Sequence, residues 1–170
     1  EVARRALADD WGGALERAYA HLAFVQSERV QAETAALLLE RWAAGAAADA
    51  TEHPLRIGQV AQLLGLSIDV LRNWERSGLL AVPRDVRNRY RLYGPAEISR
   101  LRVIRMLTRA GYSHMAILRM LLQLEAGATT DLRRSLDTPR PDEDVYSAAD
   151  RWLSTLAEQE RVALHLIAEV

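Results

Sequence analysis

Arginine and tyrosine side chains crowd into one short stretch of a chain that carries almost no net charge. The stretch RDVRNRYRLYG runs from Arg84 to Gly94 and holds four arginines and two tyrosines, whereas the formal net charge of all 170 residues is −1. A guanidinium group donates a planar pair of hydrogen bonds that matches phosphate oxygens. The stretch therefore predicts contact with a polyanion such as nucleic acid.

The spacing of these residues indicates which of them act together. Arg87, Arg89 and Arg91 alternate with a period of two, so on an extended strand they share one face and Tyr90 lies on the other. We predict a β-hairpin whose arginine face holds phosphates, with Arg89 and Arg91 as its main contacts. Arg87 is also compatible with a place in the turn itself.

Charge is segregated along the chain. Residues 55–120 carry twelve arginines against four acidic residues, a balance of +8, while residues 1–54 sum to −4 and residues 121–170 to −5. A basic centre between acidic flanks is the electrostatic pattern of a nucleic-acid-binding segment. A solvated, arginine-rich surface would give the same totals.

Two short helices must position the hairpin. The pattern predicts helices over 57–64 and 68–77, joined only by Gly65, Leu66 and Ser67. Glycine suits the end of the first helix and serine the N-cap of the second. A pair of helices joined by a three-residue turn containing glycine is a helix-turn-helix pattern.

The second helix carries polar residues on one side. Asp69, Arg72, Asn73 and Arg76 form a continuous stripe opposite an apolar face. With Ser67 at the N-cap, these are candidates for contact with base edges and phosphates in a major groove. The alternative is an ordinary solvated face in which Asp69 pairs with Arg72 or Asn73.

The remaining elements are also expected to be helical. We predict a long helix over 13–42 and two further helices over 95–111 and 113–127. The segment from 145 to 170 has a narrow apolar stripe with alternating spacings of four and three. This stripe, typical of a coiled-coil dimerisation helix, consists of Val145, Ala149, Trp152, Leu156, Ala163 and Leu166.

Four motifs, IGQVAQLLGLS, LRNWERSGLL, NRYRLY and IRMLTRAGYS, occur in that order within about residues 55–122. In order and spacing this segment resembles the DNA-binding domain of MerR-type transcription regulators. The resemblance implies a mainly α fold: a winged helix-turn-helix with a small β-hairpin wing, a second helix pair and long coiled-coil-type helices.

The resemblance also assigns roles to individual residues. It places recognition-helix positions on Ser67, Asp69, Arg72, Asn73 and Trp74, and wing contacts on Arg89, Tyr90 and Arg91. We expect Trp74 to pack in the core and Tyr93 to pack the wing. Many relatives have RYYE where this chain has RNWE, so Asn73 replaces a tyrosine that often contacts phosphate.

Three regions are expected: a helical segment and linker over 1–53, the DNA-binding domain over 54–127, and a linker with a dimerisation helix over 128–170. Residues 1–42 resemble the end of a preceding MerR-like unit, and the chain opens at Glu1 without methionine, so we expect residues upstream. The helices over 14–42 and 145–170 would then pair within one chain or between two. A simple helical extension is the alternative.

The expected function is sequence-specific binding of double-stranded promoter DNA by a homodimer or an intrachain pseudo-dimer, affecting RNA polymerase indirectly. The alternatives are a protein-interaction module and an architectural protein that binds DNA without a specific site. The resemblance implies that the DNA is bent and unwound.

Other classes of function find little support. The chain has no cysteine, and its histidines, His21, His53, His114 and His165, lack the spacing of metal ligands. No acid–base pair or phosphate-binding glycine loop indicates an enzyme, and we expect no cofactor. Without a membrane-spanning run or a signal peptide, we expect a cytoplasmic protein.

Overall fold

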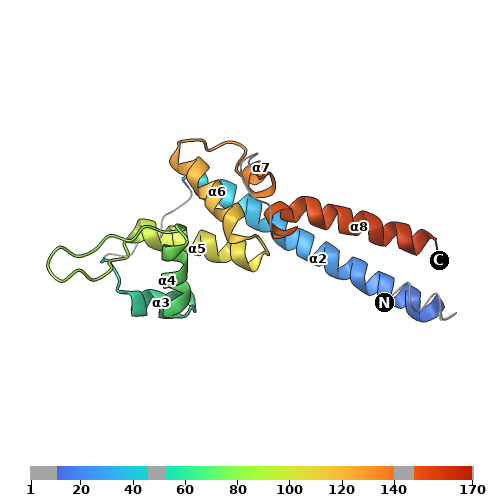
Figure 1. Ribbon diagram of the computed structural model, residues 1–170, viewed down its shortest axis with the longest axis horizontal. Helices are drawn as coiled ribbons and strands as arrows, with labels where there is room; N and C mark the ends of the chain where they lie inside the picture. Colours follow the sequence, from blue (N-terminus) through green and yellow to red (C-terminus); the bar gives the residue numbers. More distant parts are fainter. Residues whose placement is uncertain (1–10, 46–52, 140–147, 170) are drawn as a thin grey trace.

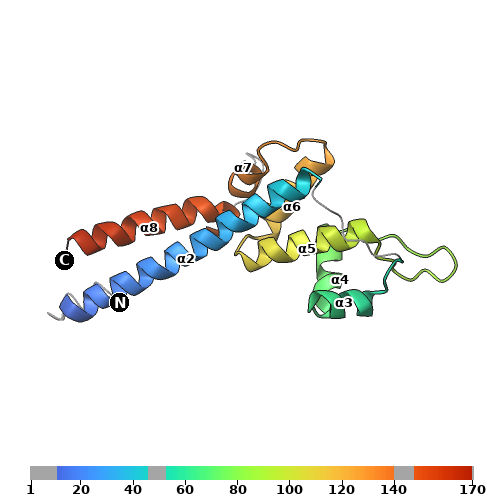
Figure 2. The same ribbon diagram turned by 180° about the vertical axis from the view of Figure 1, so that it is seen from behind.

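The computed structural model of the protein describes residues 11–45, 53–139 and 148–169, which are mainly helical. Two long helices lie side by side at one end, and the short helices and a projecting loop lie at the other (Figure 1). Seen from behind, the loop again points away from the two long helices (Figure 2). The mainly helical fold expected from the sequence is therefore observed.

The long helices are α2, Trp11–Ala43, and α8, Trp152–Ala168, and they run antiparallel (Figures 1 and 2). Leu22, Val25 and Leu156 are among the buried residues of this pair. Polar contacts flank the apolar seam, because Gln26 Nε2 and Arg29 Nη1 donate to the two carboxylate oxygens of Glu160 at 3.1 and 2.5 Å. The two long helices thus pack against each other within one chain.

The helix-turn-helix pair has the bounds expected from the sequence to within one residue. Helix α3 is Ile57–Leu64 and helix α4 is Ile68–Arg76. Gly65 ends α3 with φ of 59°, in the left-handed region that glycine adopts without strain. Ser67 caps α4, since its hydroxyl oxygen accepts a hydrogen bond from the backbone N–H of Val70 at 3.2 Å.

The second helix pair supports the first and joins it to the long helices. It consists of α5, Pro95–Arg109, and α6, His114–Glu125. From α2, the indole of Trp42 donates to the Ser99 hydroxyl at 2.6 Å. The Tyr112 hydroxyl in turn donates to the Ala32 carbonyl at 3.2 Å. One continuous core therefore extends from α3 and α4 into the base of the long helices.

A short helix, α7, Leu132–Asp137, lies in a segment that the sequence analysis assigned to a linker. Arg119 of α6 holds it in place. Its buried guanidinium donates to the carbonyls of Ser135 at 2.5 Å and Leu136 at 3.3 Å, and also to that of Asp150 at 3.1 Å. The prediction of a linker was therefore wrong for residues 132–137. The buried Arg119, which belongs to another helix, donates to the carbonyls of α7, and the local spacing of apolar residues does not reveal such a contact.

The C-terminal helix begins later than the sequence pattern predicts. Val145 lies outside the described residues, Ala149 belongs to a 3₁₀ turn over Ala148–Arg151, and α8 starts only at Trp152. Asp150 in this turn is buried, and its carboxylate accepts a hydrogen bond from the Ser113 hydroxyl. The apolar stripe in the sequence runs through this turn and predicted an α-helix there. Contacts between the turn and α6 instead keep its backbone in a 3₁₀ conformation.

The segment between α4 and α5 forms a loop, which we call the wing loop and define as residues 79–94. No strand is assigned within the described parts of the chain. Two isolated antiparallel bridges join Leu55 to Tyr93 and Arg84 to Arg91. Tyr93 is fully buried, consistent with its expected packing role. A β-hairpin is therefore not established, although the arms of the loop approach each other with antiparallel pairing.

Candidate nucleic-acid interface

Helix α4 presents the expected polar stripe to solvent. Arg72, Asn73 and Arg76 are exposed on one side, while Leu71 and Trp74 are buried on the other, with Trp74 only 3% exposed. The expectation that Trp74 packs in the core is confirmed. Asp69 lies 3.4 Å from Nη1 of Arg72, so the pair considered as an alternative does form. Both side chains remain exposed, and such a surface pair contributes little to stability.

The arginines of the wing loop do not follow the period of two expected from the sequence. Arg87 lies in the turn, and Arg89 has φ of 61°, which is left-handed rather than extended. The cause is a wide turn built on Asp85, whose carboxylate accepts from the backbone N–H groups of Arg87 and Asn88 at 2.7 and 3.3 Å. The predicted single face of three arginines was therefore wrong, although Arg87, Arg89 and Tyr90 are all exposed.

Glu75 ties the wing loop to helix α4. Its Oε2 accepts from Nε of Arg91 at 2.5 Å, and its Oε1 lies 3.7 Å from Arg84. The hydrogen bond to Glu75 is the main reason that the pKa of Arg91 is raised above its ordinary value. Arg91 is thus partly neutralised by a protein carboxylate.

Five arginines nevertheless surround one hollow of about 410 Å³ between α4 and the wing loop. We call it the arginine hollow, and its cationic residues are Arg56, Arg72, Arg84, Arg89 and Arg91. Tyr90 also lines it, and the guanidinium carbon of Arg56 lies 5.4 Å from the centre of the Tyr90 ring. This distance is within the range of a cation–π contact. Five guanidinium groups surround this space against two nearby paired carboxylates, Glu75 and Asp69, and this balance favours an anionic partner.

The sequence patterns placed neither Arg56 nor Glu75 at this site, and they singled out Arg89 and Arg91 rather than Arg84. Arg56 precedes α3, so no helical or strand period links it to the wing loop. Glu75 carried a signal, because it is one of only four acidic residues in the basic segment over 55–120. An acidic side chain in a segment with twelve arginines is a candidate for an internal ion pair.

Comparison with known proteins gives the same segment an identity. Residues 55–124 match the family described as MerR HTH family regulatory protein. The chain carries a MerR-type helix-turn-helix domain. This MerR-type domain spans α3 to α6 and includes the wing loop, the polar stripe of α4 and every residue that lines the arginine hollow.

Individual relatives match part of this chain. The mercuric resistance operon regulatory protein of Pseudomonas fluorescens is 34% identical over 82 residues, which are 48% of this chain and 56% of the relative. The protein of the same description from Serratia marcescens is 33% identical over the same shares. The nodulation protein NolA of Bradyrhizobium sp. (strain NC92) is 26% identical over 123 residues, 63% of this chain and 52% of the relative.

The chain thus spans about half the length of the curated relatives it matches. No solved structure matches it significantly. Within the described residues, no helix combines the length and apolar character that a membrane crossing requires.

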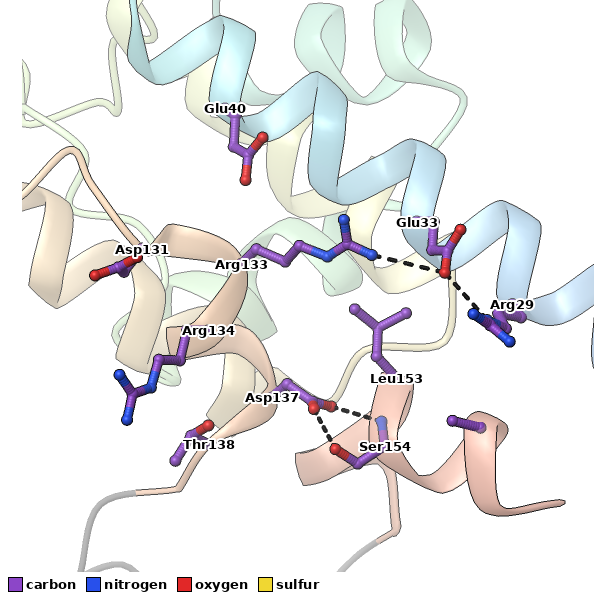
Figure 3. Close-up of a pocket in the computed structure, with 11 residues that line it drawn as sticks. Arg29, Glu33, Glu40, Asp131, Arg133, Arg134, Asp137, Thr138, Leu153 and Ser154 are labelled. Atoms are coloured by element: carbon purple, nitrogen blue, oxygen red, sulfur yellow. Dashed lines mark hydrogen bonds and ion pairs between the residues drawn. The ribbon is translucent and has the colours of Figure 1, made fainter. Parts of the chain in front are cut away.

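A second hollow, of about 570 Å³, lies outside the MerR-type domain between α2, α7 and α8 (Figure 3). Many of its charges are paired across it. Arg133 lies 3.6 Å from Glu33, which also pairs with Arg29, and Asp137 accepts hydrogen bonds from Ser154. Nowhere in the described parts of the chain do three or more His, Cys, Asp or Glu side chains group as a metal site would require.

Proposed function

We propose that this protein is a sequence-specific, double-stranded DNA-binding transcription regulator of the MerR type. In the proposed complex, α4 enters the major groove, where Arg72, Asn73 and Arg76 contact base edges and nearby phosphates. Ser67 and Asp69 lie at the end of α4 that approaches the groove floor. The arginine hollow receives a backbone phosphate beside the groove.

The observation that carries this proposal is the convergence of arginines from three separate parts of the chain on the arginine hollow. Arg56 precedes α3, Arg72 belongs to α4, and Arg84, Arg89 and Arg91 belong to the wing loop. Asp69 and Glu75 offset part of the charge of Arg72, Arg84 and Arg91, and the remaining like charges repel one another unless an anion binds between them. A DNA phosphate supplies that charge and suits the planar donors of arginine.

Arg89 is the best-placed phosphate contact among the wing-loop arginines. It is exposed, and within the described residues no carboxylate pairs with it. Arg91 shares its charge with Glu75 and serves chiefly to fix the position of the loop, and Arg87 at the turn reaches a more distant phosphate. Tyr90 stacks on Arg56 and adds its hydroxyl to the same surface.

The regulator reads its site as a homodimer or as an intrachain pseudo-dimer through the long helices. The packing of α2 against α8 within one chain supports the second arrangement. Through promoter DNA the protein acts on RNA polymerase indirectly.

The names of two relatives indicate that those proteins regulate resistance to mercury. We do not propose a response to mercury for this chain, because it has no cysteine thiolate to bind a soft metal.

The test is DNA binding measured by fluorescence anisotropy against salt concentration. Changing Arg89 to alanine should lower the magnitude of the slope of log K against log salt by ~0.9, the value for one lost phosphate contact. Arg161→Ala is the matched control, because Arg161 lies on α8 and pairs with Glu158. An unchanged slope in Arg89→Ala would remove Arg89 from the phosphate contacts.

The same assay separates the alternatives when promoter DNA and random DNA are compared. A specific regulator binds the duplex from its promoter more tightly than random duplex, by about a thousandfold or more. Equal affinity for the two duplexes would instead identify an architectural DNA-binding protein. No affinity for either would favour a protein-interaction module.

A further inference from the structure

A pocket of about 500 Å³ lies on the flank of α4, between that helix and the facing parts of α5 and α6. We call it the side pocket. It is separate from the arginine hollow, and the two share none of their lining residues. Its apolar wall is formed by Leu66, Val70 and Trp74. Pockets of this size and character are typical of small-molecule sites.

Two side chains of α5 that line the side pocket each hold a buried polar atom without a protein partner. Arg105 Nε and Thr108 Oγ1 are both buried, and neither makes a hydrogen bond within the described parts of the chain. Arg105 and Thr108 are three residues apart on a helix, so they share one face. Buried polar groups in native proteins are rarely left unpaired, and two neighbouring ones that border one pocket indicate a missing acceptor.

The chemistry of this pair specifies the acceptor. A guanidinium N–H and a hydroxyl both donate, and the guanidinium carries a full positive charge, so an anionic oxygen is the best partner. Arg109 and His114 also line the pocket and add donors at its edge. The one acidic lining residue, Asp69, has a side chain that is 89% exposed and pairs with Arg72, so it does not occupy these donors.

We propose that the side pocket binds a small organic carboxylate with an aromatic or aliphatic body. The carboxylate accepts hydrogen bonds from Arg105 Nε and the Thr108 hydroxyl, and the apolar body packs on Leu66, Val70 and Trp74. A bare inorganic anion would leave that apolar wall unused. A neutral apolar molecule would leave the two buried donors unpaired.

The site also bears on DNA binding, a consequence that rests on the proposed function. Asn73 lines the side pocket and also belongs to the exposed stripe of α4. A carboxylate bound there adds negative charge beside the surface that meets phosphates. Binding of the carboxylate and of DNA are then thermodynamically linked, each weakening the other.

Isothermal titration calorimetry on the whole chain tests the site without DNA. Phenylacetate and octanoate serve as acid probes, and phenylacetamide and octanamide as their neutral counterparts. We expect at least one acid to bind about tenfold or more tightly than its amide, as the loss of a charged hydrogen bond implies. Equal affinity for acid and amide, or no binding by either acid, would overturn the proposal.

Three variants assign the binding to the named atoms. Arg105→Gln and Thr108→Val should each weaken acid binding by about tenfold. Arg41→Gln, on an exposed position of α2, should leave it unchanged. Thr108→Val preserves side-chain shape, and thermal unfolding followed by circular dichroism verifies that each variant is folded. Unaltered affinity in both pocket variants would show that the acid binds elsewhere.

DNA titrations with and without the acid probe separate this proposal from the proposed function. We expect the acid to weaken DNA binding in the unaltered protein and to have no effect in Thr108→Val. If the protein binds no DNA, calorimetry still shows whether the side pocket binds the acid probes. If Arg105→Gln lowers the DNA salt slope by ~0.9 without any acid present, Arg105 serves a DNA phosphate and the carboxylate assignment fails.

Discussion

Arg91 of the wing loop donates a hydrogen bond from its Nε to Oε2 of Glu75, in the last turn of α4, at 2.5 Å. Both side chains are partly buried, with 28% and 19% of their surfaces exposed. The contact joins the helix proposed to read DNA bases to the loop proposed to hold phosphates. Glu75 therefore sets the spacing between the two parts of the proposed interface.

Replacing Glu75 by glutamine should lower the free energy of unfolding by about 1 kcal/mol, because a partly buried, charged hydrogen bond is lost. Chemical denaturation of Glu75→Gln, Arg91→Gln and the double variant measures the coupling directly, and we expect about 1 kcal/mol. Arg84 gives the matched control, since its distance of 3.7 Å from Glu75 predicts a weaker coupling. Equal coupling energies of Glu75 with Arg84 and with Arg91 would contradict the inference that Arg91 is the main partner of Glu75.

A close approach between Gly111 and Trp152 predicts a second effect. Gly111 has φ of 92°, and a Cβ built there would lie 2.5 Å from Nε1 of Trp152, which itself donates to the Ala110 carbonyl at 2.8 Å. Gly111→Ala should therefore destabilise the protein by about 2 kcal/mol or more, from backbone strain and the displaced indole. Thermal unfolding measures this loss.

Gly127 supplies the control for that experiment. Its φ is 83°, but a Cβ there would meet nothing within 4 Å. Gly127→Ala thus carries the backbone penalty alone, and the difference between the two variants reports the contact with Trp152. If both variants lose the same stability, the Trp152 side chain can move away from the added methyl group at position 111 without a loss of stability. Trp152 would then not fix the start of α8.

The parts of this structure that the sequence predicted are those with local causes. Helices α3 and α4 followed from apolar spacing, from Gly65 and from the Ser67 cap, all of which act within one turn of helix. The exposed stripe of α4 followed from the same period. Each of these features depends on neighbouring residues and is therefore visible in the order of amino acids.

The features that the sequence did not predict depend on distant contacts. Helix α7 is held by Arg119 of α6, and the start of α8 by the contacts of Asp150 to that helix and to Ser113. In the wing loop, Asp85 widens the turn and breaks the expected period of the arginines. Arg56 joins the arginine hollow across a gap of many residues, for which no sequence period exists.

The contact between α2 and α8 predicts a dependence of stability on pH. Hydrogen bonds from Gln26 and then Arg29 lower the pKa of Glu160 below its ordinary value of 4.5. A carboxylate with a lowered pKa in the folded state stabilises the protein above its ordinary pKa, and this stabilisation is lost as the pH falls through the lowered value. Glu160→Gln should thus be less stable than the unaltered protein at pH 7.

The difference between the two proteins should shrink as the pH is lowered below 4.5. Urea denaturation at a series of pH values measures it. A difference that stays constant across the series would mean that Glu160 acts through packing rather than charge. A Glu160→Gln variant that is more stable than the unaltered protein at pH 7 would contradict the stabilising role of the contacts to Gln26 and Arg29.

Leu156 and Leu166 belong to the same apolar stripe of α8 but differ in burial, and this difference separates packing within the chain from association between chains. Leu156 is 1% exposed, so Leu156→Ala should cost about 2 to 4 kcal/mol of stability in the single chain. Leu166 is 42% exposed, so Leu166→Ala should cost less than ~0.5 kcal/mol.

Analytical ultracentrifugation of the same two variants tests the homodimer. A dimer that uses the outer surface of α8 should dissociate more readily in Leu166→Ala, although the stability of that variant is nearly unchanged. An intrachain pseudo-dimer requires no such surface, because α2 already occupies the place of the second helix. An unaltered sedimentation coefficient in Leu166→Ala at every protein concentration would therefore favour the pseudo-dimer.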